Sequence, residues 1–161
     1  MTTVTSCDNN GMWRTEVEFV KLSPTAHEPT QGSLEAAGFD LYADTELRSQ
    51  IVLLPGEVRK ISTGIAIALP TGTFGAVYAR SGMATKRGLV PANAVGVIDS
   101  DYRGPVIVAL KNTSNEIQIV EHGERIAQLV IQPYCPAVLK EVGSIGTTAR
   151  GNGGFGSTGT N

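Results

Sequence analysis

Short apolar segments, separated by glycine, proline and polar residues, run along most of the chain. In residues 16–20 apolar and polar side chains begin to alternate, which places Val17 and Phe19 on one face of a strand. Other apolar segments end at turn signals such as Pro55-Gly56. The segments that we expect to be strands are residues 16–20, 51–54, 58–61, 65–69, 74–79, 95–98, 106–110 and 116–120. Strands spaced at roughly 8–12 residues are typical of an all-β sandwich, jelly roll or barrel, and not of an alternating α/β sheet.

Helical periodicity is scarce in this sequence. Residues 81–86 predict one short helix, with Ser81 as its N-cap. Residues 126–131 leave two interpretations open, because Ile126, Leu129 and Val130 suit one face of a helix as well as a buried strand. We therefore expect one all-β domain with one short helix.

Length and charge exclude several classes of protein. The 161 residues suffice for one domain. Only 17% of them are charged and the formal net charge is −2, which argues against disorder and against a duplex nucleic acid partner. The longest apolar runs, residues 65–69 and 106–110, are far too short to span a membrane. Residues 1–15 show no targeting signal, so we expect an intracellular protein.

The cysteines and histidines exclude further chemistry. Cys7 and Cys135 stand far apart without a Cys-x-x-Cys pair, which fits a reducing compartment and two plain thiols. His27 and His122 are the only histidines, and each lies in a connection or turn where we expect a surface position. A histidine metal site and histidine-assisted serine or cysteine catalysis are therefore not favoured.

The C-terminal residues 143–161 differ from the rest of the chain. They hold seven of the 19 glycines and one charged side chain, Arg150. One interpretation is a frayed tail. The other is a ligand-binding arm, because closely spaced backbone amides, hydroxyls and an arginine bind phosphate, and Phe155 can stack on a base. A P-loop is excluded, because the segment contains no lysine.

Two central segments carry further candidate chemistry. Arg80, Ser81 and Gly82 lie at a predicted strand-to-helix junction, where an anion is favoured, although such a group is often simply solvated. Asp99 directly follows a buried strand and can serve as a general base. Asp101 lies in a predicted hairpin turn, where aspartates more often bond their own backbone. The Asp-x-Asp spacing also occurs in nucleotide-sugar glycosyltransferases, but those enzymes are larger and built on α/β sheets.

Five segments, in order, resemble the signature motifs of the trimeric dUTPase family, the deoxyuridine triphosphate nucleotidohydrolases. They are residues 37–43, 80–82, 96–104, 123–129 and the glycine-rich tail that begins at Arg150. The resemblance covers residues 16–161. Ala79 and Met83 stand where the family usually has proline and leucine, and neither change removes a ligand.

The resemblance implies a distorted β jelly roll that assembles as a homotrimer, with active sites where subunits meet. It also implies hydrolysis of dUTP to dUMP and pyrophosphate, with Mg²⁺ bound to the triphosphate. Such an enzyme limits uracil incorporation into DNA and supplies dUMP for dTMP synthesis. We accordingly expect a poorly ordered leader over residues 1–15, a jelly-roll domain over residues 16–142 and a flexible arm over residues 143–161 that closes over the active site.

The resemblance further implies roles for single residues. Asp99 would activate the water that attacks the α-phosphorus, and Tyr102 would pack on the deoxyribose and exclude a 2′-hydroxyl. Asp40 would support the water shell of the Mg²⁺ ion. The remaining substrate-binding positions are Asn93, Gly96 and Phe155 for the uracil, and Arg80, Ser81, Gly82, Gln128, Arg150, Ser157 and Thr158 for the phosphates, with Gly154 and Gly156 beside them.

Two rival functions stay open. A dCTP deaminase shares this fold and trimer, but the tail from Arg150 onward argues against it. A catalytically silent binding module belongs to a different class of protein. A module without catalysis does not need all of the candidate site residues, so the presence of four of them argues against it: Arg80, Ser81, Asp99 and Arg150.

Overall fold

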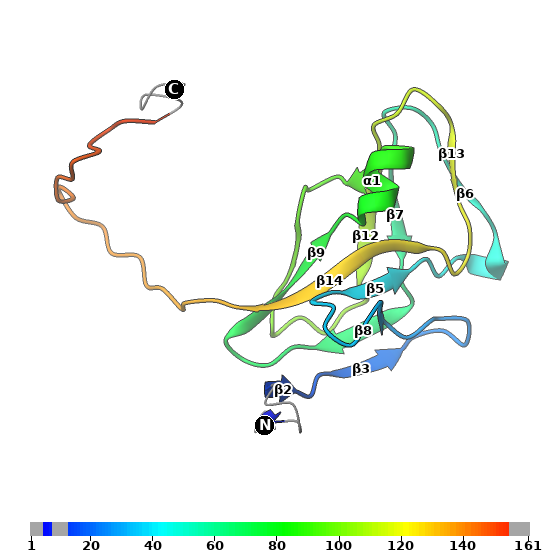
Figure 1. The fold of residues 1–161 in the computed structure, drawn as a ribbon, viewed down its shortest axis with the longest axis horizontal. Coiled ribbons are helices and arrows are strands. Elements are labelled where there is room, and N and C mark those ends of the chain that lie inside the picture. The colour runs from blue at the N-terminus through cyan, green and yellow to red at the C-terminus, as the bar shows by residue number, and fades with distance from the viewer. Residues whose placement is uncertain (1–4, 8–12, 155–161) are drawn as a thin grey trace.

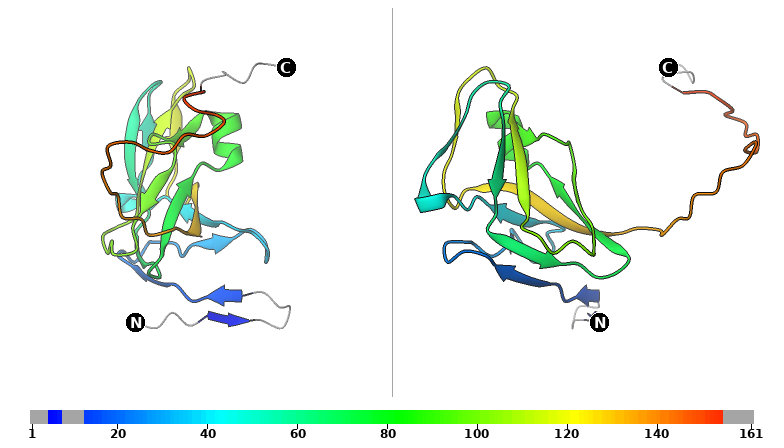
Figure 2. Two further views of the ribbon diagram at one scale, coloured as in Figure 1. Left: turned by 90° about the vertical axis from the view of Figure 1, so that its left-hand side faces the viewer. Right: turned by 180° about the vertical axis from the view of Figure 1, so that it is seen from behind.

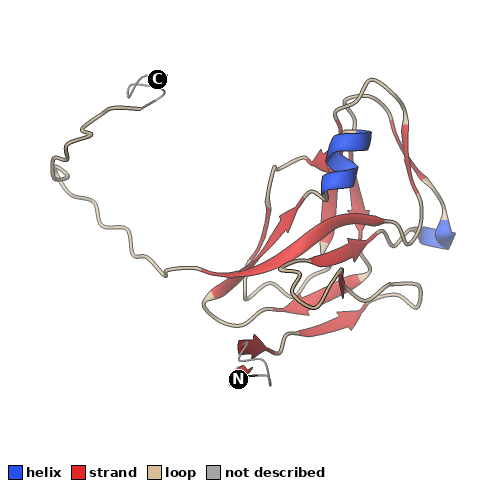
Figure 3. Cartoon of the chain, in the orientation of Figure 1, coloured by secondary structure: helices blue, strands red, loops and turns tan. Residues whose placement is uncertain are grey.

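The computed structural model describes residues 5–7 and 13–154, in which strands predominate (Figures 1 and 3). Helical structure in these residues is limited to α1 (Ser81–Arg87) and the 3-10 helix Glu46–Arg48. The strands are β1 (Thr5–Cys7), β2 (Trp13–Thr15), β3 (Glu18–Lys21), β4 (Thr30–Gln31), β5 (Phe39–Tyr42), β6 (Ile51–Leu53), β7 (Val58–Ser62), β8 (Ile65–Ala68), β9 (Thr73–Tyr78), β10 (Leu89–Pro91), β11 (Gly96–Ile98), β12 (Ile107–Asn112), β13 (Gln118–Val120) and β14 (Arg125–Pro133). The prediction of an all-β fold with one short helix is confirmed.

Two antiparallel sheets form the body of the domain. The larger has the strand order β11-β9-β14-β5-β4, and the smaller has the order β10-β12-β7. The pairs β1-β2, β3-β8 and β13-β6 accompany them. The long strand β14 pairs with β9 on one side and with β5 on the other. The segment 126–131, which the sequence left open between helix and strand, is therefore part of a central strand. Its backbone N–H and C=O groups form hydrogen bonds with β9 on one side and β5 on the other.

The hydrophobic core draws on both sheets. On β12 the buried Val108 and Leu110 alternate with more exposed neighbours, as expected for a strand with one face inward. On β14 the side chains of Ile126, Ala127 and Leu129 are buried. Burial of an aliphatic side chain of this size contributes about 2 kcal/mol. This core fixes the strands whose ends carry the candidate site.

Several elements differ from the sequence prediction. The first predicted domain strand lies two residues later, as β3, and all its residues are exposed. The sequence did not predict β5, because Asp40 interrupts its apolar pattern; pairing with β14 and β4 holds this segment extended. Within the predicted leader, β1 and β2 pair as a short antiparallel hairpin with Cys7 opposite Trp13.

Helix α1 begins and ends at positions that its backbone explains. Its N-cap is Arg80, whose φ and ψ of −81° and 138° are extended, so the prediction of Ser81 as N-cap is wrong. Ser81 is already helical, and its carbonyl accepts a hydrogen bond from Thr85 Oγ1 at 2.8 Å. The helix ends at Arg87 and is followed by the C-cap Gly88, whose positive φ of 65° favours glycine. A methyl group added there would lie 2.9 Å from the backbone nitrogen of Ser114.

The two histidines have different environments. His27 is exposed, as expected, and its ring stacks on that of Tyr42 with centroids 5.1 Å apart. His122 is not a surface residue, because only 11% of its side chain is exposed. Its Nδ1 accepts a hydrogen bond from the backbone N–H of Thr45 at 3.2 Å. The turn that contains His122 folds back onto Ala43, the residue after β5, because the N–H of Gly123 donates to the carbonyl of Ala43 at 2.8 Å; the sequence pattern did not reveal this contact.

Beyond β14 the described chain has no regular structure, and Figures 1 and 2 show it leading away from the sheets. Its apolar side chains Val138, Leu139 and Ile145 are almost fully exposed. No helix in the described part of the chain has the length and apolarity that a membrane crossing requires.

Candidate active site

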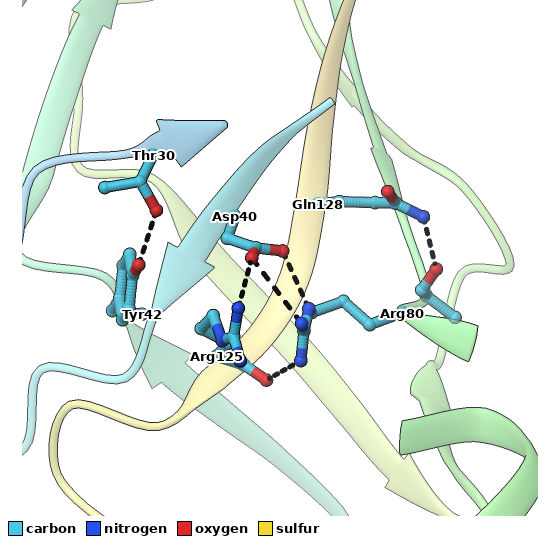
Figure 4. Close-up of polar contacts among 7 residues, drawn as sticks. Thr30, Asp40, Tyr42, Arg80, Arg125 and Gln128 are labelled. Carbon is cyan, nitrogen blue, oxygen red and sulfur yellow. Dashed lines mark hydrogen bonds and ion pairs between the residues drawn. The ribbon is translucent and has the colours of Figure 1, made fainter. Parts of the chain in front are cut away.

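Three elements of the larger sheet bring polar side chains together in one pocket (Figure 4). Asp40 comes from β5, Arg80 joins β9 to α1, and Arg125 and Gln128 come from β14. Gln128 lies opposite Asp40 of β5 in one pairing and opposite Tyr78 of β9 in the other, so it stands between these two strands. The pocket has a volume of about 560 Å³ and is lined by Gly32, Ala36, Ala37, Gly38, Asp40, Arg80, Ser81, Gly82, Arg125, Gln128 and Val130.

Asp40 binds two arginines in this pocket. Arg80 Nε donates to its Oδ1 at 2.7 Å, and Arg125 Nη1 donates to its Oδ2 at 3.1 Å. Arg80 Nη1 also donates to the carbonyl of Arg125 at 3.4 Å. The Asp40 side chain is only 13% exposed, whereas that of Arg125 is 51% exposed. Two cations and one carboxylate leave this group with one net positive charge, which favours an anionic ligand.

Gln128 connects two walls of the pocket. Its Nε2 donates to the carbonyl of Ala79 at 2.9 Å. Its Oε1 points toward Gly38, where an added methyl group would lie 3.0 Å from that oxygen. By contrast, a methyl group at Gly82 would meet no described atom within 4 Å. The pocket is therefore closed behind Gln128 and open beside Gly82.

A second group of predicted site residues follows β10 and surrounds β11. Asn93 is exposed, and its Nδ2 would lie 3.5 Å from a methyl group at Gly96, so these two positions are neighbours. Asp99 is exposed just beyond β11, and its carbonyl accepts the N–H of Tyr102 at 3.1 Å in a turn. Tyr102 Oη donates to the carbonyl of Pro105 at 3.1 Å.

The structure does not bring Asp99 into the pocket of its own chain. Ile98 pairs with Gly75 on β9, so Asp99 lies beside the beginning of that strand, while Arg80 follows its end. Continuing this register places Asp99 opposite Phe74, and the six residues from Phe74 to Arg80, at about 3.3 Å each, separate the two positions by about 20 Å. The predicted site therefore consists of two groups on one chain, with Asp40, Arg80, Ser81, Gly82 and Gln128 in the first and Asn93, Gly96, Asp99 and Tyr102 in the second.

The predicted residues of the arm lie in neither group. Arg150 and Gly154 are exposed, and the arm turns at Gly151, whose N–H donates to the carbonyl of Thr148 at 3.0 Å. Phe155, Gly156, Ser157 and Thr158 lie outside the described residues.

Arg125 and Gly38 line the pocket but were not singled out from the sequence. Arg125 is the only cation in the segment 123–129 and lies three residues before the predicted ligand Gln128. Its position in that segment was the available signal. For Gly38 the sequence offered only its place in the motif 37–43. The reason that a small residue is required there is the contact with Gln128, which only the structure shows.

The fold and the pocket define an all-β protein with an arginine-lined site suited to phosphate groups. Comparison with known proteins shows to which family this chain belongs. The dUTPase family model matches residues 25–159. The deoxyuridine 5'-triphosphate nucleotidohydrolase of Anaplasma marginale is 44% identical over 132 residues, which are 82% of this chain and 88% of that protein. Its counterpart from Methylocella silvestris is 48% identical over 131 residues, which are 81% of this chain and 82% of that protein.

Solved structures agree with this result. A mutant Staphylococcus bacteriophage 80alpha dUTPase with dUpNHpp has a TM-score of 0.81 at 30% identity, covering 90% of this chain and 99% of that one. A mutant dUTPase from phage phi11 of S. aureus, which reveals the coordination of a structural Mg(II) ion, has a TM-score of 0.71 at 27% identity, covering 81% and 98%. The chain belongs to the dUTPase family. The resemblance seen in the five motifs is thereby confirmed, as are the jelly-roll-like fold and the assignment as an enzyme.

Proposed function

We propose that this protein hydrolyses dUTP to dUMP and pyrophosphate at sites completed between the subunits of a homotrimer. Membership of the dUTPase family supports the substrate and the reaction. The separation of Asp99 from Arg80 supports the shared site, because a gap of about 20 Å along β9 is too wide for both to act on one phosphorus atom. A second subunit that presents its Asp99 to the pocket would close this gap.

In this proposal the pocket binds the triphosphate. Arg80 and Arg125 supply positive charge, while Ser81, the Gly82 backbone and the Gln128 amide supply hydrogen-bond donors. Asp40 keeps the two guanidinium groups in fixed positions before substrate arrives. Donors fixed in this way need little rearrangement in the transition state, which is the main source of electrostatic catalysis.

Asp99 of the neighbouring subunit would act as the general base. Its carboxylate takes a proton from a water molecule while the water oxygen forms a bond to the α-phosphorus. The bond from that phosphorus to the bridging oxygen breaks, and pyrophosphate leaves with the electron pair. Positioned attack of this kind needs no covalent intermediate on the enzyme, which agrees with the lack of a histidine-activated nucleophile in the sequence.

The region around β11 would recognise the nucleoside. Asn93 and the backbone at Gly96 lie together at the start of β11, where exposed amide groups can pair with the edge of uracil. Tyr102 is held over Gly104 and would pack on the deoxyribose. A ring fixed there leaves no space for a 2′-hydroxyl, so UTP would be rejected.

The donor set of the pocket fits a Mg²⁺ ion that the triphosphate itself carries. Among the described residues no group of three or more His, Cys, Asp or Glu side chains forms a metal cage. Both oxygens of Asp40 already accept N–H groups, so Asp40 would contact the ion through a coordinated water. When bound, Mg²⁺ neutralises negative charge on the phosphate oxygens.

The arm would complete the trimer and the site. Val138, Leu139 and Ile145 leave the domain almost fully exposed, and contact with a second copy of the chain would remove them from water. Farther along, Arg150 would contact the terminal phosphate. Phe155 would cover the uracil, and Ser157 and Thr158 would add phosphate contacts beside Gly154 and Gly156.

The activity would limit uracil incorporation into DNA and supply dUMP for dTMP synthesis inside the cell.

The decisive experiment is pyrophosphate release from dUTP, UTP, dTTP and dCTP, each with and without Mg²⁺. We expect release from dUTP alone, dependent on Mg²⁺, from a species whose sedimentation mass is near three chains. Ammonia release from dCTP without pyrophosphate from dUTP would instead identify a deaminase. Binding of dUTP without turnover would identify a silent binding module.

A further inference from the structure

The last residue of α1 connects the helix to the turn before β14. Arg87 Nε donates to Gln118 Oε1 at 3.0 Å, and its two Nη atoms donate to Glu124 Oε1 and to the carbonyl of Ile119. Nη1 also lies 3.7 Å from the sulfur of Met83, the buried residue of the helix. All three guanidinium nitrogens thus have partners outside the pocket, none of which lines it.

Glu124 is itself fixed on both sides. Its Oε2 accepts the backbone N–H of Glu121 at 3.1 Å, and its carbonyl accepts the N–H of Ala43 at 2.8 Å. Only 28% of the Arg87 side chain and 25% of the Glu124 side chain are exposed. A pair this sheltered is screened less by solvent than an ordinary surface ion pair.

The next residue in the chain brings this connection to the pocket. Arg125 binds Asp40, and its carbonyl accepts a hydrogen bond from Arg80 Nη1. Helix α1 is therefore tied to residues 124–125 at both ends, by Arg80 before its first residue and by Arg87 at its last. Between these two ties lie Ser81 and Gly82, which line the pocket opposite Arg125 and Gln128.

We propose that Arg87 and Glu124 are positioning residues, which set the spacing between the α1 wall and the β14 wall of the phosphate pocket without touching the substrate. The inference rests on the proposed function, because it assigns the consequence of that spacing to dUTP binding. The guanidinium group suits this role, because its planar fork bonds acceptors in several directions at once. A lysine ammonium group can replace the charge of Arg87 but not the planar set of N–H donors that reaches all these acceptors.

The test measures steady-state hydrolysis of dUTP by Arg87→Gln, Arg87→Lys, Glu124→Gln and the double variant Arg87→Gln/Glu124→Gln. The spacing between the two walls determines how tightly the phosphates are bound, and it does so equally in the ground state and the transition state. We therefore expect KM to rise about fivefold while kcat changes less than about twofold. The double variant should match the worse single variant, because both substitutions break one connection. Arg87→Lys should recover only part of the KM change.

Binding of a non-hydrolysable imido analogue of dUTP, measured by calorimetry, provides a readout independent of turnover. Its Kd should rise with KM in the Arg87 and Glu124 variants. Arg59→Gln is the control, because it breaks an arginine–glutamate pair away from the pocket: Arg59 on β7 pairs with Glu57 at 2.7 Å, although its side chain is more exposed than that of Arg87. That variant should leave both KM and Kd unchanged.

Several outcomes would overturn the inference. Variants of Arg87 that lower the melting temperature but leave KM and Kd unchanged would assign the pair to stability alone. Effects that multiply in the double variant would show that the two residues act separately. If Arg87→Gln fails to fold, the same measurements of KM and Kd are made on Arg87→Lys, and unchanged values would overturn the inference. Failure of the wild-type protein to release pyrophosphate from dUTP would contradict the proposed function instead, and would be seen before any variant is made.

Discussion

Asp40 on β5 and Arg80 beyond β9 form an ion pair through Oδ1 and Nε at 2.7 Å, although 40 residues separate them in the chain. β14 lies between their strands, and its Arg125 binds the second carboxylate oxygen. The carboxylate thus orders two cations that would otherwise repel each other. Asp40, a residue expected to support a metal ion, thus holds in place the two arginines that we propose to bind phosphate.

Replacing Asp40 by asparagine should destabilise the domain. Hydrogen bonds to charged groups contribute about 1.5–3 kcal/mol, so Asp40→Asn should lower the free energy of unfolding by about 2 kcal/mol. Urea denaturation measures this change. Asp101→Asn is the control, since Asp101 is exposed and has no side-chain bond in the described structure. Equal stability of the two variants would contradict the role given to Asp40.

Asp99→Asn should abolish turnover and leave nucleotide binding intact, because the base is lost and a neutral isostere remains. We expect kcat to fall by about 10² to 10⁴-fold. Calorimetry with the imido analogue should give a Kd close to that of the wild type. A kcat near the wild-type value would show that Asp99 is not the base.

The proposed sharing of each site between two subunits makes a stronger prediction for mixtures of variants. Asp99→Asn and Arg80→Ala should each be inactive, but their mixed trimers should contain one site with both residues intact. Statistical co-refolding of equal amounts should then restore about a quarter of the wild-type activity. A mixture with no more activity than its components would place the whole site within one chain.

Gly104→Ala should weaken the discrimination between dUTP and UTP. A methyl group at Gly104 would lie 2.6 Å from Cζ of Tyr102 and closer still to its hydroxyl oxygen, so the ring must move. We expect the ratio of kcat/KM for dUTP over UTP to fall about tenfold, which corresponds to about 1.4 kcal/mol. Gly143→Ala, where an added methyl group meets no described atom within 4 Å, should leave the ratio unchanged.

Gly64→Ala should destabilise the protein far more than Gly56→Ala. Both glycines have positive φ, 68° and 78°, so alanine costs about 1–2 kcal/mol at either position. At Gly64 the methyl group would also lie 2.6 Å from Cβ of Ala26 and against Asp44, which Ser23 and Thr25 hold at 2.6 and 2.7 Å. This overlap adds about 2 kcal/mol. Similar denaturation midpoints for the two variants would contradict this account.

Truncation after Ile145 should remove activity without unfolding the domain. The residues removed contribute nothing to the described core, so the melting temperature should stay close to that of the full chain. Loss of Arg150 and of the glycines that we propose to bind phosphate should lower kcat/KM by about 10²-fold or more. Full activity of the truncated protein would show that the glycine-rich segment is an ordinary frayed end.

The sequence by itself determined the fold class, the family and the motif residues. Apolar segments at strand length, broken by turns such as Pro55-Gly56, suffice to indicate an all-β domain, because alternation and turn chemistry are local. Local patterns failed where long-range contacts decide. Asp40 breaks the pattern of β5, yet pairing with β14 makes it a strand, and Ser81 resembles an N-cap, yet Arg80 occupies that position.

Tertiary structure alone decided which motif residues meet. Asp40, Arg80 and Gln128 converge because β5, β14 and β9 are neighbours in one sheet, a fact of long-range pairing that no local sequence pattern encodes. The same sheet places Asp99 at the other end of β9, which is why we propose that a second subunit completes the site. The buried environment of His122 and the contacts of Arg87 likewise arise only when distant turns pack together.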